Sequence, residues 1–145
     1  MQISTRFSIA IHVLSCLMVF KDKFKLTSDF LAKSTNVNPV IIRKILGQLK
    51  NAGLIEVNRG SGGASIIKPL NEITLLDVYK ATECVEHGKL FDFHENPNAL
   101  CPVGKNIHKV IDNKLLRAQE ALENELSKVT LENLKEDFSK IINDK

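Results

Sequence analysis

The sequence predicts a mainly α-helical protein with one small β-hairpin, and three observations lead to this expectation. Apolar residues recur with the helical period of about 3.6 residues in several parts of the 145-residue chain. A glycine-rich segment at 60–64 lies between two short stretches of alternating apolar residues, a pattern typical of a hairpin. A long amphipathic stretch begins at Pro102 and predicts an extended helix.

The composition excludes several classes of protein. With 26% charged and 43% hydrophobic residues, the chain does not belong to the wholly disordered class. Its three cysteines are an odd number, which excludes a closed disulfide framework within one chain. Tryptophan is absent and aromatic residues make up 6%, so the sequence does not favour a platform of aromatic side chains for stacking bases.

The net charge of +3 conceals an asymmetry between the two halves of the chain. Residues 1–68 carry ten basic and three acidic side chains, a net charge of +7. Residues 69–145 carry ten basic and fourteen acidic side chains, a net charge of −4. A basic segment joined to an acidic one indicates that the first half binds a polyanion.

The first apolar run, at 7–20, follows Arg6 and resembles a short signal sequence. His12 interrupts the run, however, and about 14 residues are too few to span a bilayer. We therefore expect a buried helix that contains His12, no membrane partner, and a cytoplasmic protein with reduced thiols. The helix is apolar on two faces, and the second consists of Ile9, Val13, Cys16 and Phe20. This second face is a candidate surface for the long helix of a partner subunit.

The next segment predicts two short helices joined by a tight turn. Thr27 or Ser28 is a plausible N-cap for the first helix. Asn38 is the N-cap of the second, Pro39 its first residue and Gly53 its terminator. The buried stripe of the second helix is expected to contain Ile41, Ile42, Ile45, Leu46 and Leu49. Two such helices form a helix-turn-helix, whose second helix commonly enters the major groove of DNA.

The hairpin completes a winged helix. Strands are expected at 54–59 and 65–68, with the glycine-rich tip at 60–64 between them. Glycines in the tip allow a close approach to a phosphate backbone, and Arg59 at its base suits the narrow minor groove. A nucleotide-binding phosphate loop is disfavoured because the segment joins two strands and lacks the lysine that follows such a loop.

The second half predicts a dimerisation unit. A helix is expected at 73–83 with Thr74 as its cap, then a loop at 84–101, a helix from Pro102 to about Lys128, and a last helix. The long helix has an apolar side, lined by Val103, Ile107, Val110, Ile111, Leu115, Ala118, Leu122 and Leu126. A twofold partner would cover this side.

We therefore divide the chain into three parts. Residues 1–70 form a winged helix-turn-helix DNA-binding domain, and residues 71–101 form a connecting helix and an effector loop. Residues 102–145 form the dimerisation helix and a C-terminal helix. This division follows the change from basic to acidic composition.

The order of elements resembles the Rrf2 family of bacterial winged-helix transcription regulators. The resemblance is carried by the segments 37–46, 49–55 and 59–64, and Cys101-Pro102-Val103-Gly104 resembles the effector region of the family. It implies that the start of the second helix binds the major groove and the wing arginine the minor groove. The implied DNA-binding residues are Thr5, Arg6, Asn38, Val40, Arg43, Lys44, Arg59, Gly60, Ser61 and Gly62.

The sequence departs from this family at the position of its iron–sulfur cluster. Cluster-binding members have three closely spaced cysteines before the long helix, whereas only Cys101 matches here. Because a cluster needs about four ligands, we expect none. Zinc bound by Cys84, His87, His94 and Cys101 is a weaker possibility, because the spacing is not that of a standard finger. We therefore expect no metal cofactor.

Cys101 is a candidate redox switch. It directly precedes the first residue of the long helix, where the helix dipole favours a thiolate. A reactive thiol there would respond to oxidants or electrophiles. A purely structural cysteine is the competing interpretation.

These features predict a homodimeric, sequence-specific DNA-binding regulator, expected to be a repressor that binds a palindromic operator of double-stranded DNA. The alternative is a winged-helix interaction module that a partner protein controls and that does not bind DNA itself. An enzyme is not expected, because no catalytic grouping of Ser, His and Asp or of Cys and His is present in the sequence pattern.

Overall fold

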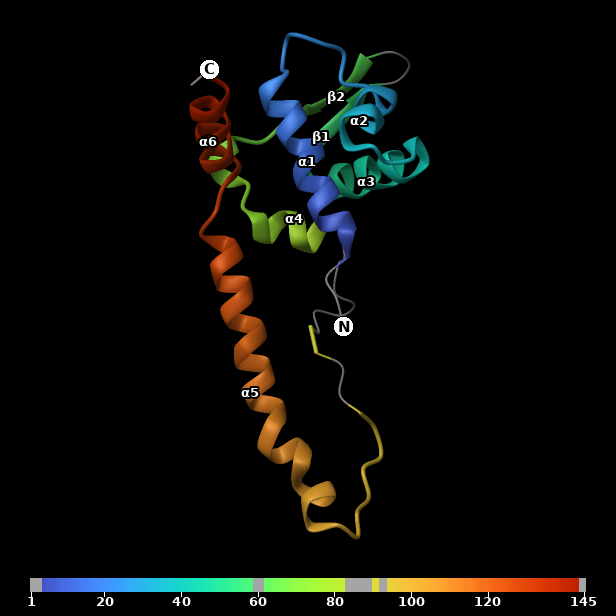
Figure 1. Ribbon diagram of the computed structural model, residues 1–145, viewed down its shortest axis with the longest axis vertical. Helices are drawn as coiled ribbons and strands as arrows, with labels where there is room; N and C mark the ends of the chain where they lie inside the picture. Colours follow the sequence, from blue (N-terminus) through green and yellow to red (C-terminus); the bar gives the residue numbers. More distant parts are fainter. Residues whose placement is uncertain (1–3, 59–61, 83–89, 92–93, 144–145) are drawn as a thin grey trace.

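Figure 1 shows a computed structural model of the protein, which describes residues 4–58, 62–82, 90–91 and 94–143. Helices dominate and one two-stranded antiparallel sheet forms the wing, so the predicted fold class is confirmed. In chain order the elements are α1 (Thr5–Val19), α2 (Ser28–Thr35), α3 (Pro39–Asn51), β1 (Ile55–Asn58), β2 (Gly63–Ile66), η2 (Leu70–Glu72), α4 (Leu75–Ala81), α5 (Pro102–Ser127) and α6 (Leu131–Asn143).

Helix α1 forms the centre of the N-terminal body, which consists of α1, α2, α3, α4 and the wing. Its N-cap is Ser4, whose hydroxyl accepts a hydrogen bond from the Arg6 backbone N–H at 3.1 Å. Helices α2, α3, α4 and α6 and strand β2 all pack against α1. Val13 and Cys16 of its second apolar face are buried by the chain itself. These two residues are therefore not available to the long helix of a partner, contrary to the expectation from the sequence, whereas Ile9 and Phe20 of the same face are half-buried.

His12 is exposed, contrary to the expectation of a buried histidine. It lies at the edge where α1 meets α2, and its Nε2 atom is 3.0 Å from the Ser34 hydroxyl. The same hydroxyl is 3.3 Å from the Cys16 sulfur atom. The central helix α1 therefore carries one polar, exposed position, at which His12 contacts α2.

The helix-turn-helix follows the predicted caps. Thr27 caps α2 by accepting a hydrogen bond from the backbone of the first turn at 3.2 Å. Asn36 ends α2 in the left-handed conformation, with φ of 55°. Asn38 caps α3 and Pro39 is its first residue, and Gly53 ends the segment with φ of 77°.

One residue of the predicted buried stripe of α3 is misplaced. Ile41 is 42% exposed, whereas the remaining members of the stripe are buried: Ile42, Ile45, Leu46 and Leu49. A helix turns by about 100° for each residue, so Ile41 lies one step away from this stripe. It faces solvent together with Val40, which is 63% exposed.

The wing is shifted relative to its prediction. Strand β1 is one residue shorter at each end than the strand expected at 54–59, and β2 begins two residues before the strand expected at 65–68. Gly63 and Ala64, expected in the hairpin tip, therefore belong to β2 and pair with β1.

A contact with the loop before α2 explains this shift. The Ala64 N–H donates a hydrogen bond to the Leu26 carbonyl oxygen at 3.0 Å. Gly63 has φ of 74°, and a Cβ atom there would lie 2.9 Å from backbone atoms of Leu26. Only glycine tolerates this approach, so the wing is fixed to the body at Gly63.

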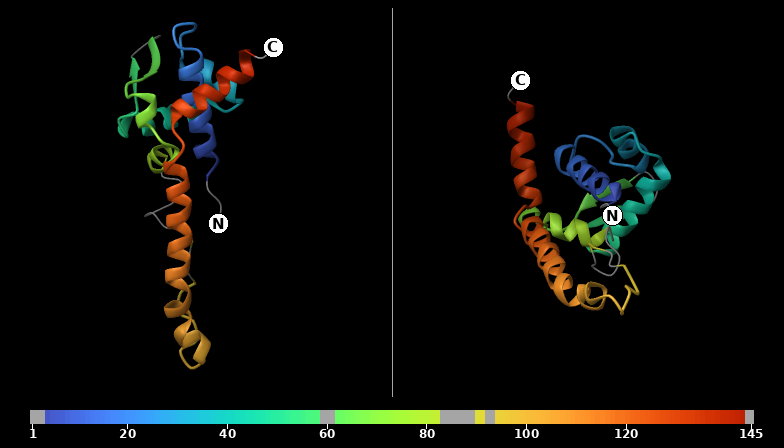
Figure 2. Two further views of the ribbon diagram at one scale, coloured as in Figure 1. Left: turned by 90° about the vertical axis from the view of Figure 1, so that its left-hand side faces the viewer. Right: turned by 60° about the horizontal axis from the view of Figure 1, so that its bottom comes forward.

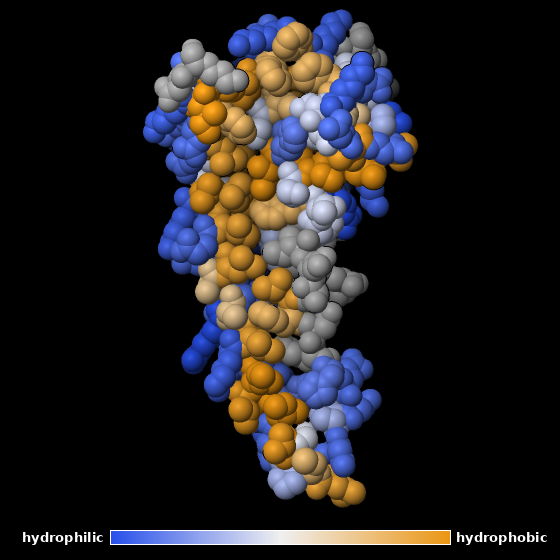
Figure 3. All heavy atoms as spheres, in the orientation of Figure 1, coloured by the Kyte–Doolittle hydropathy of each residue, from blue (hydrophilic) through white to orange (hydrophobic). Residues whose placement is uncertain are grey.

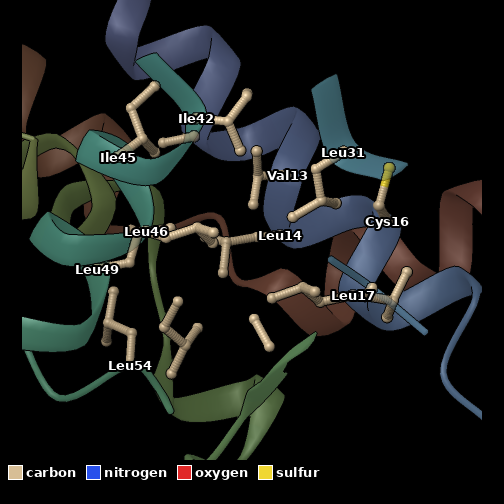
Figure 4. Packing of buried hydrophobic residues seen from close by; sticks show 14 of the residues in the cluster. Val13, Leu14, Cys16, Leu17, Leu31, Ile42, Ile45, Leu46, Leu49 and Leu54 are labelled. Atoms are coloured by element: carbon tan, nitrogen blue, oxygen red, sulfur yellow. The ribbon is translucent and has the colours of Figure 1, made fainter. Parts of the chain in front are cut away.

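Buried side chains from α1, α2 and α3 meet those of the wing in one core (Figure 4). Leu14 of α1, Leu31 of α2 and Ile45 of α3 are completely buried. Ile55 of β1, which is 1% exposed, continues the core to the sheet. Burial of side chains of this size contributes roughly 1.5–3 kcal/mol each, so the core fixes α3 and the wing relative to one another.

Helix α4 and the junction between α5 and α6 are joined by backbone hydrogen bonds. Thr74 caps α4 in a capping box with Asp77. The Leu75 N–H donates to the Val129 carbonyl oxygen, and the Leu131 N–H donates to that of Ile73, both at 2.9 Å. The start of α6 is therefore attached to the N-terminal body.

Helix α5 extends away from this body, whereas α6 returns to pack against α1 and η2 (Figures 1 and 2). Of the 26 residues of α5 only Gln119 is buried, and its Oε1 atom accepts a hydrogen bond from the Leu90 N–H at 2.9 Å. Within the described part of the chain, no helix has both the length and the apolar character needed to cross a membrane.

Candidate nucleic-acid interface

The outer face of α3 combines apolar and basic side chains. Val40, Arg43 and Lys44 are all exposed, and their spacing places them on one side of the helix. Gly47 follows on the same side, and beyond its own stretch of helix no described atom lies within 4 Å of the place of its missing Cβ. The structure thus brings together three predicted DNA-binding residues on a surface that the rest of the chain leaves open.

Asn38 lies at the N-terminal end of this face. Its Oδ1 atom accepts a hydrogen bond from the Val40 N–H at 2.8 Å and so caps α3. A bidentate contact with adenine uses both the oxygen and the nitrogen of an asparagine amide. With Oδ1 engaged in the cap, the free donor is Nδ2, which suits a phosphate oxygen.

A cleft of about 370 Å³ separates α3 from the wing. We call it the recognition groove, and its lining residues are Leu26, Thr27, Ser28, Arg43, Leu46, Gly47, Lys50, Val57, Asn58, Gly63 and Ala64. Arg43 and Lys50 give it positive charge, and the N-terminus of α2 opens into it at Thr27 and Ser28. Helix N-termini carry unpaired N–H groups and a partial positive charge, both of which favour a phosphate.

The other predicted DNA-binding residues lie elsewhere. Thr5 is exposed in the first turn of α1, and the Arg6 side chain donates from Nε to the Ser4 hydroxyl at 3.4 Å. Neither Thr5 nor Arg6 lines the recognition groove. Gly62 is exposed just before β2. The other residues predicted in the tip lie outside the described residues: Arg59, Gly60 and Ser61.

Cys101 is exposed and forms the N-cap of α5. Its side chain makes no capping hydrogen bond, but the backbone N–H groups of Gly104 and then Val103 lower the pKa of its thiol below the ordinary value. This agrees with the expected influence of a helix N-terminus on a cysteine. The low pKa increases the thiolate fraction at neutral pH.

Comparison with known proteins identifies the family. The sequence pattern of the Rrf2 family, described as iron-dependent transcriptional regulator, matches residues 3–137. The chain belongs to the Rrf2 family. The HTH-type transcriptional regulator YwnA of Bacillus subtilis is 39% identical over 132 residues, which cover 91% of this chain and 96% of YwnA. The protein is therefore a helix-turn-helix transcriptional regulator that binds DNA, and it is not an enzyme.

Solved structures agree with this membership. The crystal structure of a protein described as DNA-binding is 36% identical, with a TM-score of 0.70 over 89% of this chain and 97% of that one. A transcriptional regulator from Lactobacillus plantarum is 25% identical, with a TM-score of 0.76 over 93% and 90% of the two chains. Oxidised CymR of Staphylococcus aureus, 23% identical with a TM-score of 0.67 over 94% and 97%, shows the shared fold.

The iron in the description of the Rrf2 family has no matching donor set in the described residues. No group of three or more His, Cys, Asp or Glu side chains there is placed to hold a metal ion. His94 and His108 are close, with ring centroids 5.5 Å apart, and His108 Nδ1 lies 3.1 Å from a carboxylate oxygen of Asp112. Cys84 and His87 of the considered zinc set lie outside the described residues. The described residues therefore do not fit iron or zinc.

Several contributors to the recognition groove are not among the DNA-binding residues expected from the sequence, and three of them bear on phosphate binding or on access to α3. They are Gly47, Lys50 and the N-terminus of α2 at Thr27 and Ser28. The place of Gly47 on this face could have been predicted from the sequence, because it lies four residues after Arg43 and therefore on the same side of the helix. The N-terminus of α2 reaches the groove only through the docking of the wing, which no local pattern reveals.

Two glycines of this Rrf2 protein are expected to respond oppositely to the same substitution. Gly47→Ala should raise the free energy of unfolding by about 1 kcal/mol, because alanine is a better helix former and has open space at this position. Gly63→Ala should lower it by about 1–3 kcal/mol, because a Cβ atom meets the Leu26 backbone at positive φ. Urea unfolding of the two variants measures both changes, and a Gly63→Ala variant as stable as the wild type would contradict the packing of the wing.

The lowered pKa of Cys101 predicts fast alkylation at neutral pH. The rate of reaction with iodoacetamide should rise with pH and reach half its maximum at a lower pH than the rate for an ordinary free cysteine thiol. Mass spectrometry of tryptic peptides measures this rate at Cys101, and buried Cys16 is the internal control. A midpoint at or above the usual value would show that the helix N-terminus does not stabilise the thiolate.

Proposed function

We propose that the protein acts as a homodimeric repressor that binds a palindromic operator through α3 and the wing. The observation that carries this proposal is the exposed face of α3 beside the recognition groove, where Val40, Arg43 and Lys44 are open to a ligand. In this arrangement α3 occupies the major groove and the adjoining phosphate backbone enters the recognition groove. A bound dimer would obstruct access to the promoter.

The chemistry of the α3 face suits base recognition. Arg43 can donate two hydrogen bonds to the O6 and N7 atoms of guanine, and Val40 offers an apolar contact to a thymine methyl group. Lys44 and Lys50 are suited to phosphate oxygens as point charges. The net charge of +7 on residues 1–68 supplies the long-range attraction to DNA.

Dimerisation is supported by the apolar side of α5. The helix has 26 residues and is about 39 Å long, and only Gln119 is buried by this chain. An apolar band runs along its length in Figure 3. Large apolar side chains on this side of the helix and just before its N-cap are more than half exposed, namely Leu100 at 93%, Val103 at 68% and Val110 at 56%. A second copy related by a twofold axis would cover them and would place two α3 helices on one duplex.

The proposed function is tested by titrating the protein against genomic fragments in gel-shift assays. We expect a few fragments to bind at least 10³-fold more tightly than random duplex. The affinity should fall linearly with the logarithm of salt concentration, because lysines and arginines displace counterions from the DNA. Equal affinity for all fragments would overturn the proposal and would favour the interaction module controlled by a partner protein.

We further propose that Cys101 makes the dimer responsive to oxidants. The N-terminal end of α5 is the part of the helix farthest from its own body (Figure 1). In a dimer built on α5, a modification of the Cys101 sulfur would act on the packing of the two helices. Treatment with diamide should release DNA from the wild type and not from Cys101→Ser. Equal release from both proteins would dismiss the switch.

A further inference from the structure

A second groove lies along the wing, beside β2. Its volume is about 470 Å³, larger than that of the recognition groove beside β1. Leu26 and Ala64 line both grooves. The two grooves therefore meet where the hydrogen bond between these residues attaches the wing to the body. We call the second one the lysine groove. Its volume is within the range of about 300–1,000 Å³ typical of sites for small molecules.

The floor of the lysine groove is apolar. Leu17 and Met18 at the end of α1 are buried in the core, and so is Leu26. Ile66 and Leu70, at the end of the wing and in η2, are half-buried and complete the floor. Side chains of this kind bind an aliphatic or aromatic body by excluding water from it.

The rim of the lysine groove is basic. Four exposed lysines from three separate parts of the chain converge on it: Lys21, Lys25, Lys68 and Lys135. Asp22 is the one carboxylate among the described residues that line it. The ion pairs found in the described part of the chain join other residues, so no carboxylate neutralises these four ammonium groups at close range. Converging cations without partners favour an anion.

We propose that the lysine groove binds a small amphiphilic carboxylate. Its apolar chain lies on the floor between α1 and β2, and its carboxylate lies among the lysine ammonium groups. Phosphates of the operator are the competing occupant of the lysines, but no residue of α3, the helix proposed to enter the major groove, lines this groove. Lys135 moreover belongs to α6, which is part of neither the helix-turn-helix nor the wing.

The position of the groove connects this ligand to DNA binding, and this part rests on the proposed function. The hydrogen bond of 3.0 Å from the Ala64 N–H to the Leu26 carbonyl fixes the wing, and both residues line both grooves. A ligand held against Leu26 and Ile66 would favour one position of the wing over others. The affinity for the operator would then change, and the operator would change the affinity for the ligand by the same factor.

Calorimetric titration of the full-length protein with octanoate tests the site without DNA. Octanoate, kept below the concentration at which it forms micelles, should bind saturably. Its affinity should be at least tenfold higher than that of acetate, which lacks the apolar chain, and than that of octanol, which lacks the charge. Lys135→Glu should weaken octanoate binding by about tenfold, because it replaces an attractive charge with a repulsive one. Lys140→Glu, also exposed on α6 but outside the groove, should bind octanoate like the wild type. Equal octanoate affinity of Lys135→Glu and the wild type would overturn the proposal.

Fluorescence anisotropy with a labelled operator separates the two possible occupants. Octanoate should change the operator affinity of the wild type and of Lys140→Glu by at least threefold, and should leave that of Lys135→Glu unchanged. A loss of operator affinity by Lys135→Glu without octanoate would assign the lysine to DNA phosphates and overturn the proposal. If no specific operator exists, the proposed function fails, and the calorimetric result still decides the ligand site.

Discussion

Replacing Arg43 by alanine is expected to weaken binding to the operator by about 1–3 kcal/mol for each half-site, which corresponds to about 5- to 150-fold. Arg43 is exposed on α3 and lines the recognition groove, so its guanidinium is free to bind a guanine. Because the side chain is outside the core, the free energy of unfolding should change by less than about 0.5 kcal/mol. Fluorescence anisotropy with operator duplexes and urea unfolding measure the two quantities.

The same titration distinguishes recognition of bases from general attraction to DNA. Arg43→Ala should lose affinity for the operator and retain its weak affinity for random duplex, because a base contact adds specificity. Lys140→Ala, which removes one exposed positive charge from α6, serves as the control and should change neither value by more than about twofold. A loss of equal size for operator and random duplex would show that Arg43 only contacts phosphates.

Substitution of Val110 by aspartate is expected to separate the two protomers and thereby reduce operator affinity by about 10²–10⁴-fold. Val110 is 56% exposed on the apolar side of α5, so the monomer loses little contact. In the proposed dimer, the new carboxylate would be buried without a partner, which is strongly unfavourable. Sedimentation velocity measures the oligomeric state of the variant, and anisotropy measures its affinity for DNA.

Lys109→Asp is the matched control for this experiment. It introduces the same residue at the neighbouring position, which points about 100° away from Val110 on a helix and is exposed on the charged side. We expect Lys109→Asp to remain dimeric and to bind the operator. Dimers of Val110→Asp at micromolar concentration would contradict the assignment of this side of α5 to the subunit interface.

Features that are determined by a few neighbouring residues could be predicted from the sequence. Helices α2, α3 and α4 begin after their N-caps Thr27, Asn38 and Thr74, whose side chains accept hydrogen bonds from the first turn of each helix. Gly53 ends α3 because its backbone adopts positive φ without strain. These caps act within four residues, so the printed sequence is enough to locate them.

Features that depend on distant contacts could not be predicted in this way. The shift of β2 follows from the hydrogen bond between Ala64 and Leu26, which lie 38 positions apart. Val13 and Cys16 of the second apolar face of α1 are buried by the chain itself, and α6, from the far end of the sequence, packs against α1. Local periodicity shows that such a face will be buried and does not show by which element.

The candidate DNA interface was predicted in part for the same reason. The exposed face of α3 is a property of one helix. The resemblance to the Rrf2 family implied its residues Val40, Arg43 and Lys44, and all three are exposed on one side of the helix. The contribution of Lys50 and of the N-terminus of α2 arises where three elements meet. The lysine groove likewise gathers residues from α1, the loop after it, the wing and α6, and no single segment of the sequence indicates it.

Selection of bound sequences from a pool of random duplexes tests the central claim most directly. A homodimer that presents two α3 helices predicts an enriched inverted repeat whose half-sites are separated by about one helical turn, 10–10.5 base pairs, or a multiple of it. Two protomers should bind each selected duplex, and Arg43→Ala should relax the preference at one base pair of each half-site. Enrichment of no sequence, or of a single asymmetric half-site bound by one protomer, would contradict the account.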